Sequence, residues 1–326
     1  MQYELNKGIT DQLKGIGIIF VIFGHLCLLD IIKMPSDKFD YAGVWGVTIF
    51  LILSGYGLTQ SYLKKGIHFN FLSKRFSKVA IPYVIITIVW IVVDKIVFNI
   101  EYGSIQTLKV LLGLNFNYPV DPTMWYITYI FMWYIVFFVI FILPIKDILK
   151  VLLIISISLI LHITSFNVIF DWNFYVFAFP IGVVISYGLS IMNKYDIKLK
   201  YQNMILILLT IIFFRLFLHY IFKVYDLTFY SLLSVSSIFL TFGLCTLLVV
   251  TKFKSKLLAF IGTISYELYL IEGKLLFIYG MPKVSDILWI RILDYTITIL
   301  ISAYVLSKIS SHINKLNSRK WLRSLR

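Results

Sequence analysis

The stretch KGIGIIFVIFGH, residues 14–25, decides the fold class. A lysine begins it, a histidine ends it, and the ten residues between them are all apolar or glycine. The apolar run continues to about residue 32 without a small-residue cleavage site, so it predicts a retained membrane-spanning helix rather than a signal peptide. Since Lys14 and His25 are about three helical turns apart, they should lie on nearly one face, about 16 Å apart along the axis.

The composition extends this prediction to the whole chain. Of its 326 residues, 60% are hydrophobic, 17% aromatic and only 14% charged, and the mean hydropathy is +0.89. These values exclude a water-soluble domain and predict an all-α, polytopic transmembrane helical bundle. The net charge of +14 does not indicate nucleic-acid binding, because the basic residues lie between apolar blocks. Cys27 and Cys245 lie in separate apolar segments, so neither a disulfide framework nor a metal site is expected.

Hydropathy predicts about ten spans in a single integral membrane domain over residues 1–326. Twenty-one of the 30 Lys and Arg residues fall at the termini and in alternate loops, which predicts that both termini are cytoplasmic and that the protein is multi-pass in the cell membrane. The predicted spans lie at about 14–32, 44–63, 79–98, 124–143, 149–166, 172–191, 203–222, 230–250, 257–279 and 286–308.

His25 is the first candidate for chemistry, because an ionisable side chain deep in a span is costly and points to function. The alternative is a structural histidine bonded to a neighbouring helix. Asp30 is the nearest carboxylate in the sequence and a candidate to orient the imidazole. Its five-residue spacing from His25 is poor for a helix, however, and favours an aspartate at the membrane interface.

Four further features are candidates for binding. Ser54 and Tyr56 belong to a small-residue segment, GVTIFLILSGYGLT at 46–59, which allows close helix contact or leaves room for a ligand. Lys74, Arg75 and Lys78 form the basic side of an interfacial helix before the third span, which fits anionic lipid attraction or a phosphate-binding patch. Arg215, one turn before His219, either contacts an anionic sugar or snorkels to the interface. Glu267 or Glu272 is expected to pair with Lys14 or Lys274.

Taken together, these stretches resemble the membrane acyltransferase-3 family. The first span has that family's basic residue, ten residues and histidine, and FLILSGY (50–56) resembles its Phe-rich stretch ending in Ser-Gly-Phe. KRFSKVAIP (74–82) resembles the basic pair and proline before its third span, and MWYI (124–127) resembles its Leu-Trp-Phe-Leu. ISYELYLIE (264–272) is similar to its Ser-Tyr-x-x-Tyr-Leu-x-His, with Glu272 in the place of a second histidine.

The resemblance implies an O-acyltransferase that moves an acyl group, usually acetyl, from cytoplasmic acyl-CoA to a hydroxyl of an extracytoplasmic or lipid-linked glycan, without a metal. The expected partners are membrane lipid, the glycan acceptor, and a second copy or a glycan-synthesis protein. His25 is expected to act as a base or as a transient acyl carrier. Polysaccharide or solute export and a purely structural role are the alternatives, although the sequence has no inverted repeat. The predicted residues are His25, Asp30 and Glu272 for catalysis, Lys14, Arg75, Lys78, Ser54 and Tyr56 for acyl-CoA, and Trp125, Tyr126, Arg215 and Tyr266 for the acceptor.

Overall fold

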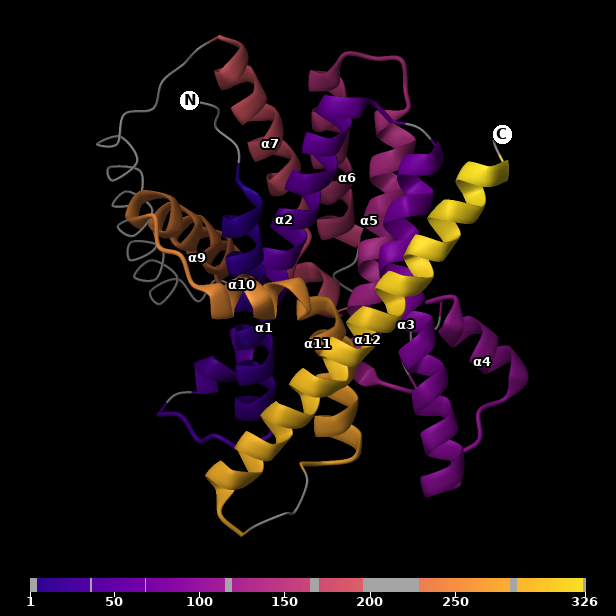
Figure 1. The fold of residues 1–326 in the computed structure, drawn as a ribbon. Coiled ribbons are helices and arrows are strands. Elements are labelled where there is room, and N and C mark those ends of the chain that lie inside the picture. The colour runs from indigo at the N-terminus through magenta and orange to yellow at the C-terminus, as the bar shows by residue number, and fades with distance from the viewer. Residues whose placement is uncertain are drawn as a thin grey trace. The chain divides into compact units, whose positions relative to one another are not determined.

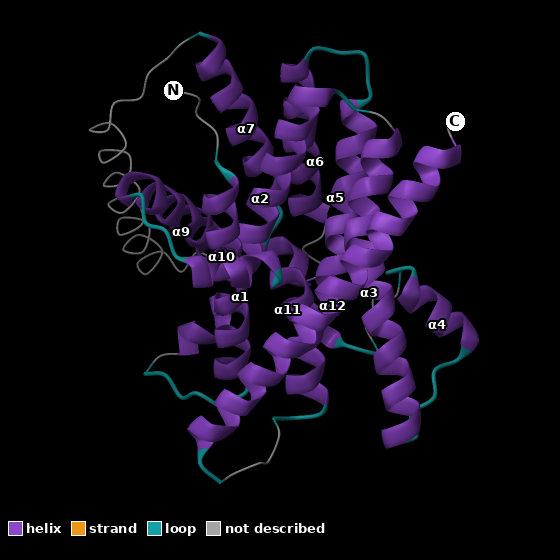
Figure 2. Ribbon diagram, in the orientation of Figure 1, coloured by secondary structure: helices purple, strands orange, loops and turns teal. Residues whose placement is uncertain are grey.

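The computed structural model describes residues 5–35, 37–67, 69–114, 119–164, 170–195, 229–281 and 286–324. Within these ranges every regular element is a helix, which confirms the predicted all-α fold (Figures 1 and 2). Eight of the described helices are long and apolar enough to cross a bilayer, so the chain is a multi-pass membrane protein. They are Lys7–Leu28, Phe39–Lys65, Arg75–Phe98, Pro122–Phe141, Asp147–Thr164, Trp172–Lys194, Leu233–Thr251 and Leu288–Leu316.

Two of the ten predicted spans have no counterpart among these eight helices. The span predicted at 203–222 lies outside the described residues. The stretch predicted as one span at 257–279 is instead divided into α10 (Lys256–Thr263), α11 (Ser265–Gly273) and η5 (Lys274–Ile278), which is a π-helix. Average hydropathy does not register such a division, because the residues on both sides of the break are apolar on average.

The described chain forms two compact units. Residues 1–67 and 139–263 make unit 1, and residues 68–138 and 264–326 make unit 2. Unit 1 contains α1 (Lys7–Leu28), η1 (Asp37–Tyr41), α2 (Ala42–Lys65), α6 (Asp147–Thr164), η4 (Phe170–Phe174), α7 (Ala178–Lys194), α9 (Phe229–Thr251) and α10. Unit 2 contains α3 (Phe69–Phe98), α4 (Ser104–Leu111), η2 (Pro122–Met124), most of α5 (Trp125–Phe141), α11, η5 and α12 (Leu288–Ser324).

Glycines bring the helices of unit 1 into close contact. A Cβ atom on Gly182 of α7 would overlap the carbonyl oxygen of Ile52 in α2, and one on Gly55 of α2 would overlap the carbonyl oxygen of Phe179 in α7. Small residues permit this approach of two backbones, which is a common way for helices to associate in a membrane. Leu13 of α1, with Leu53 and others from α2 and α9, completes a buried apolar cluster.

Aromatic side chains hold α3 in unit 2. Phe76 stacks on Phe131 of α5 with ring centroids 4.7 Å apart. Further along α3, the indole N–H of Trp90 donates to the carbonyl of Leu270 in α11 at 3.4 Å. The basic helix predicted before the third span is thus continuous with that span, because α3 runs without a break from Phe69 to Phe98.

Candidate functional site

Lys14 and His25 lie along one stripe of α1, as their spacing predicts. Lys14 Nζ is 3.3 Å from Asp11 Oδ1, and the Lys14 side chain is 39% exposed. Ile18 and Val21, which lie between the two ends of the stripe, are buried, and His25 itself is half-buried. The stripe therefore has a cation paired with a carboxylate at one end and an imidazole at the other, separated by buried apolar residues.

The neighbouring faces of α1 are packed against other helices of unit 1. Gly15 meets the backbone of Leu258 in α10, where a Cβ atom would overlap the Leu258 carbonyl oxygen. Gly24 meets the backbone of Gly43 in α2 in the same way. With a rotation of about 100° per residue, Lys14 and His25 lie between these two packed faces. Backbone packing on both sides fixes the rotation of α1, and hence the direction of this stripe.

Asp30 lies beyond the end of α1. Its amide donates to the carbonyl of Cys27 at 2.8 Å, its φ is 53°, and its side chain is exposed. Aspartate tolerates this left-handed conformation better than most residues, which suits it to a helix end. Asp30 thus lies beyond the apolar helix Lys7–Leu28, and its place at the membrane interface stays a prediction.

The Ser-Gly-Tyr segment of α2 is used for packing. Gly55 provides the contact with α7 described above. The hydroxyl of Tyr56 accepts a hydrogen bond of 2.9 Å from the amide of Leu5, and the Tyr56 side chain is buried. Ser54 is half-buried in the same turn. The segment is predicted either to allow close helix contact or to leave room for a ligand, and Gly55 serves close helix contact.

Six of the predicted site residues belong to unit 2. Arg75 is half-buried and Lys78 is exposed at the start of the span in α3. One residue later, the carbonyl of Val79 accepts a hydrogen bond of 2.8 Å from the hydroxyl of Tyr266 in α11. Tyr266 therefore ties α11 to α3 directly beside the basic segment.

Aromatic rings surround the start of α5. Trp125 and Tyr126 have ring centroids 6.3 Å apart, and Tyr126 meets Tyr269 of α11 edge to face at 5.5 Å. The Tyr269 hydroxyl in turn donates to the carbonyl of Thr123. The remaining predicted acceptor residue, Arg215, lies outside the described residues.

A buried ion pair joins α3 to η5. Lys274 Nζ lies 2.7 Å from Asp94 Oδ2, and both side chains are almost completely buried. The same ammonium donates to the carbonyl of Val120 at 2.6 Å. Tyr102 and Tyr279 donate to the Asp94 carboxylate at 2.6 and 2.8 Å. The pair thus has several of the additional hydrogen bonds that a buried ion pair needs.

Glu272 is fully buried on α11. It stands where many members of the family that the sequence resembles have a histidine. The hydroxyl of Tyr295 in α12 lies 3.2 Å from the Glu272 carbonyl and 3.5 Å from Glu272 Oε2. The expectation that Lys274 pairs with Glu267 or Glu272 is wrong, because Lys274 pairs with Asp94 instead. Lys14 has Asp11 as its carboxylate partner.

Asp121 is a second buried carboxylate near this ion pair. It is 1% exposed and caps η2, where its Oδ1 accepts from the amide and hydroxyl of Thr123 at 2.8 and 2.7 Å. Its Oδ2 is buried and accepts no hydrogen bond from the described residues. Burial raises the pKa of Asp121 to about 6, in spite of the bonds from Thr123, and the nearby Glu272 carboxylate adds to the increase.

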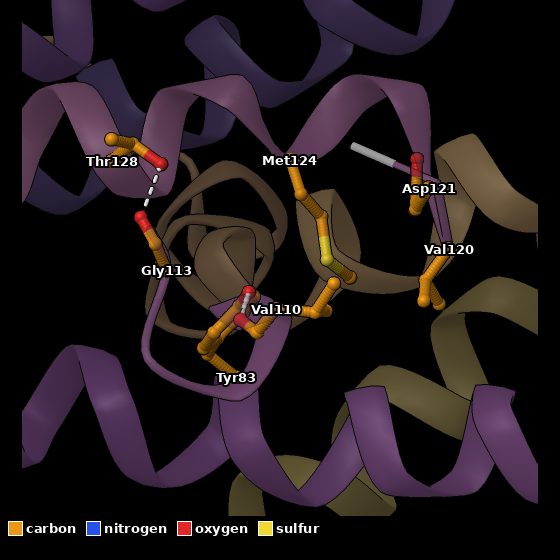
Figure 3. Close-up of a pocket in the computed structure, with 7 residues that line it drawn as sticks. All are labelled: Tyr83, Val110, Gly113, Val120, Asp121, Met124 and Thr128. Carbon is orange, nitrogen blue, oxygen red and sulfur yellow. Dashed lines mark hydrogen bonds between the residues drawn. The ribbon is translucent and has the colours of Figure 1, made fainter. Parts of the chain in front are cut away.

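A small pocket lies next to Asp121 (Figure 3). Asp121 is at one end of it, and Thr128 is at the other, where its hydroxyl donates to the carbonyl of Gly113 at 2.7 Å. The Tyr83 hydroxyl donates to the carbonyl of Val110 on a third side. The lining residues are Tyr83, Val110, Gly113, Val120, Asp121, Met124 and Thr128.

The comparison with protein families assigns the chain. A family model described as an acyltransferase domain, that of the acyltransferase-3 family, matches residues 9–308. The chain belongs to the membrane acyltransferase-3 family. It is therefore an acyltransferase, as the sequence resemblance implies. No curated protein and no solved structure matches it significantly.

In this acyltransferase the predicted residues fall into two groups. Unit 1 holds Lys14, His25, Asp30, Ser54 and Tyr56, and unit 2 holds Arg75, Lys78, Trp125, Tyr126, Tyr266 and Glu272. Sequence reasoning missed two carboxylates of unit 2. Asp94 had a signal, because it is an acid within the apolar stretch IVVDKIVF of a predicted span. Asp121 lies in a predicted loop, where an aspartate before a proline is an ordinary turn residue.

Proposed function

We propose that this acyltransferase moves an acyl group, acetyl as the first choice, from acyl-CoA to a hydroxyl of an extracytoplasmic or lipid-linked glycan. Acyl-CoA would enter from the cytoplasmic side, where the charge distribution of the loops predicts both termini. The observation that carries the proposal is the stripe of α1, with Lys14 and His25 separated by about 16 Å of helix. A donor with phosphates at one end and a thioester at the other end of a long thin arm suits such a separation.

The basic start of α3 supports the same donor. Arg75 and Lys78 lie at the beginning of a span, where cations can bind phosphate without the cost of crossing the bilayer core. Lys14 is a weaker phosphate ligand while it is paired with Asp11, so phosphate binding would have to compete with that carboxylate. We assign Arg75 the larger share of donor binding, because a guanidinium can hold phosphate through two hydrogen bonds.

The chemistry requires one proton acceptor. The acceptor oxygen attacks the thioester carbonyl carbon, the carbon–sulfur bond breaks, and an ester and a CoA thiolate form. His25 would take the proton of the hydroxyl and return it to the thiolate sulfur. If His25 instead carries the acyl group, its ring nitrogen attacks the thioester first and the acceptor hydroxyl attacks the acyl-imidazole second.

Replacement of His25 tests the proposal. Membranes with the full chain would be given radiolabelled acetyl-CoA, and label would be counted in the lipid and glycan fractions. His25→Ala should lower transfer by at least about 100-fold, as expected for loss of a general base. His312→Ala, at an exposed position of α12, is the matched control and should transfer like the wild type. Full transfer by the His25 variant would contradict the assignment.

The two roles of His25 differ before any acceptor is bound. A carrier releases about one equivalent of CoA thiol per enzyme in a rapid burst without acceptor, whereas a base releases none in that phase. Rapid-mixing measurement of free thiol from the purified protein separates them. Succinyl-CoA in place of acetyl-CoA, in the same assay, tests the choice of acyl group.

A further inference from the structure

Asp121 is held in place, but among the described residues only one of its two carboxylate oxygens accepts a hydrogen bond. Two hydrogen bonds from Thr123 fix its Oδ1, and Thr123 is itself held by the Tyr269 hydroxyl at its carbonyl. The backbone of Gly273 packs directly against the Thr123 side chain, so that a Cβ atom there would overlap it. The carboxylate therefore cannot turn to find a second partner for Oδ2, and a buried oxygen without a hydrogen bond is expensive.

Lys274 does not relieve this cost. Its ammonium is 2.7 Å from Asp94 and donates to the carbonyl of Val120, one residue before Asp121. The bond to Val120 holds the backbone beside Asp121 while the charge of Lys274 is compensated by Asp94. Asp121 thus lines the pocket with a carboxylate that is held in position, while the neighbouring cation is paired with another acid.

The other polar groups of the pocket also accept. The hydroxyls of Tyr83 and Thr128 donate their hydrogens to the carbonyls of Val110 and Gly113, so neither has a hydrogen left to donate to a guest. Figure 3 shows these hydroxyls and Asp121 around the same small space, with Met124 between them. A pocket of this kind favours a small group that donates a hydrogen bond and discriminates against one that only accepts.

We propose that this pocket binds a hydroxyl group of the acyl acceptor, and that Asp121 Oδ2 accepts the hydrogen bond from that hydroxyl. The inference rests on the proposed function, since an alcohol acceptor supplies the donor that the pocket lacks. It assigns Asp121 to acceptor binding, a role that the sequence motifs do not indicate. Since no described residue donates to Oδ2, binding of a hydroxyl would add a hydrogen bond to a charged group.

Asp121→Asn is the decisive variant, because asparagine has the same shape and can still accept from Thr123 through its Oδ1. Its amide would present an N–H where the carboxylate presents an oxygen, so the pocket would lose its main acceptor. In the radiolabelled acetyl-CoA assay, transfer to the membrane acceptor should fall by about 10- to 100-fold, the range for a hydrogen bond to a charged group. Glu101→Gln makes the same chemical change at an exposed acid, which is 3.0 Å from Lys95, and should leave transfer unchanged.

Two readouts separate binding from a structural role. The thermal midpoint of purified Asp121→Asn should not be lower than that of the wild type at pH 8, because the variant removes a buried charge. Wild-type transfer should rise as the pH increases through about 6, where Asp121 ionises, and the variant should lose the part of this rise that Asp121 contributes. The pH profiles of the wild type and the variant must be compared because other titratable groups surround Asp121. These groups are Glu272, Lys274, Tyr269, Tyr279 and Tyr295.

An infrared experiment tests the pocket without acyl transfer. The carboxylate band that disappears in Asp121→Asn should shift when methanol is added to the wild-type protein at pH 8, because methanol is a small hydroxyl donor. An unchanged band, or a variant that transfers like the wild type, would overturn the proposal and leave the pocket to water. If wild-type membranes transfer no acetyl group, the proposed function fails, while the methanol shift still decides whether the pocket takes a hydroxyl.

Discussion

Asp94 and Lys274 illustrate how much depends on single residues in this protein. Each is nearly fully buried, and two tyrosine hydroxyls and one backbone carbonyl complete their hydrogen bonds. Removing one member of such a pair leaves the other charge buried alone, which typically costs about 3–5 kcal/mol. Replacing both by apolar or neutral groups costs much less, because no charge remains to be compensated.

We therefore predict that Lys274→Met lowers the thermal midpoint of the purified protein sharply and that Asp94→Asn with Lys274→Met recovers most of the loss. Exposed pairs should behave differently, so Lys95→Met, which breaks the exposed pair with Glu101, serves as the control and should change the midpoint little. Unfolding in detergent, followed by circular dichroism, measures all three. Equal midpoints for Lys274→Met and the control would show that the buried pair is not stabilising.

Some features of single residues follow from the sequence, whereas others depend on contacts between distant parts of the chain. His25 and Lys14 could be placed on one face because both lie on one helix, whose periodicity is known in advance. The partner of Lys274 could not be predicted, because Asp94 is 180 residues away and no local pattern relates the two. The position of the Asp121 carboxylate depends on how Thr123 and Gly273 meet, which is equally non-local.

The glycines of α7 allow a test of the backbone contact between α2 and α7. Gly182 and Gly188 lie on the same helix, α7, but only Gly182 faces a neighbouring backbone. Gly182→Ala should destabilise unit 1 by about 1–3 kcal/mol, because its methyl group would overlap the Ile52 carbonyl and force α7 away from α2. Gly188→Ala meets nothing within 4 Å and should be neutral or stabilising by up to about 1 kcal/mol, since alanine is the better helix former.

Thermal unfolding of the two variants measures this difference directly. A Gly182→Ala midpoint at or above that of Gly188→Ala would mean that α2 and α7 are not in backbone contact.

Hydropathy predicts the eight long apolar helices correctly, because a bilayer requires long apolar segments whatever their partners. It did not predict the division of 257–279 at Ile264, or the π-helix η5, because these depend on backbone hydrogen bonding rather than on composition.

The direction of the whole molecule in the membrane decides which of its residues meet cytoplasmic acyl-CoA. Charge in alternate loops predicts that both termini and the start of α3 face the cytoplasm. Because α3 crosses the bilayer, Glu101 beyond its end should then face the opposite side from Ser73 near its beginning. This orientation would bring Arg75 to the side where acyl-CoA is found.

Cysteine labelling in intact cells checks this orientation. In a background with Cys27 and Cys245 replaced by alanine, a membrane-impermeant maleimide should label Glu101→Cys in intact cells. Ser73→Cys and a cysteine added after Arg326 should be labelled only after the membrane is opened. The reverse pattern would place Arg75 outside and remove the argument for a cytoplasmic donor.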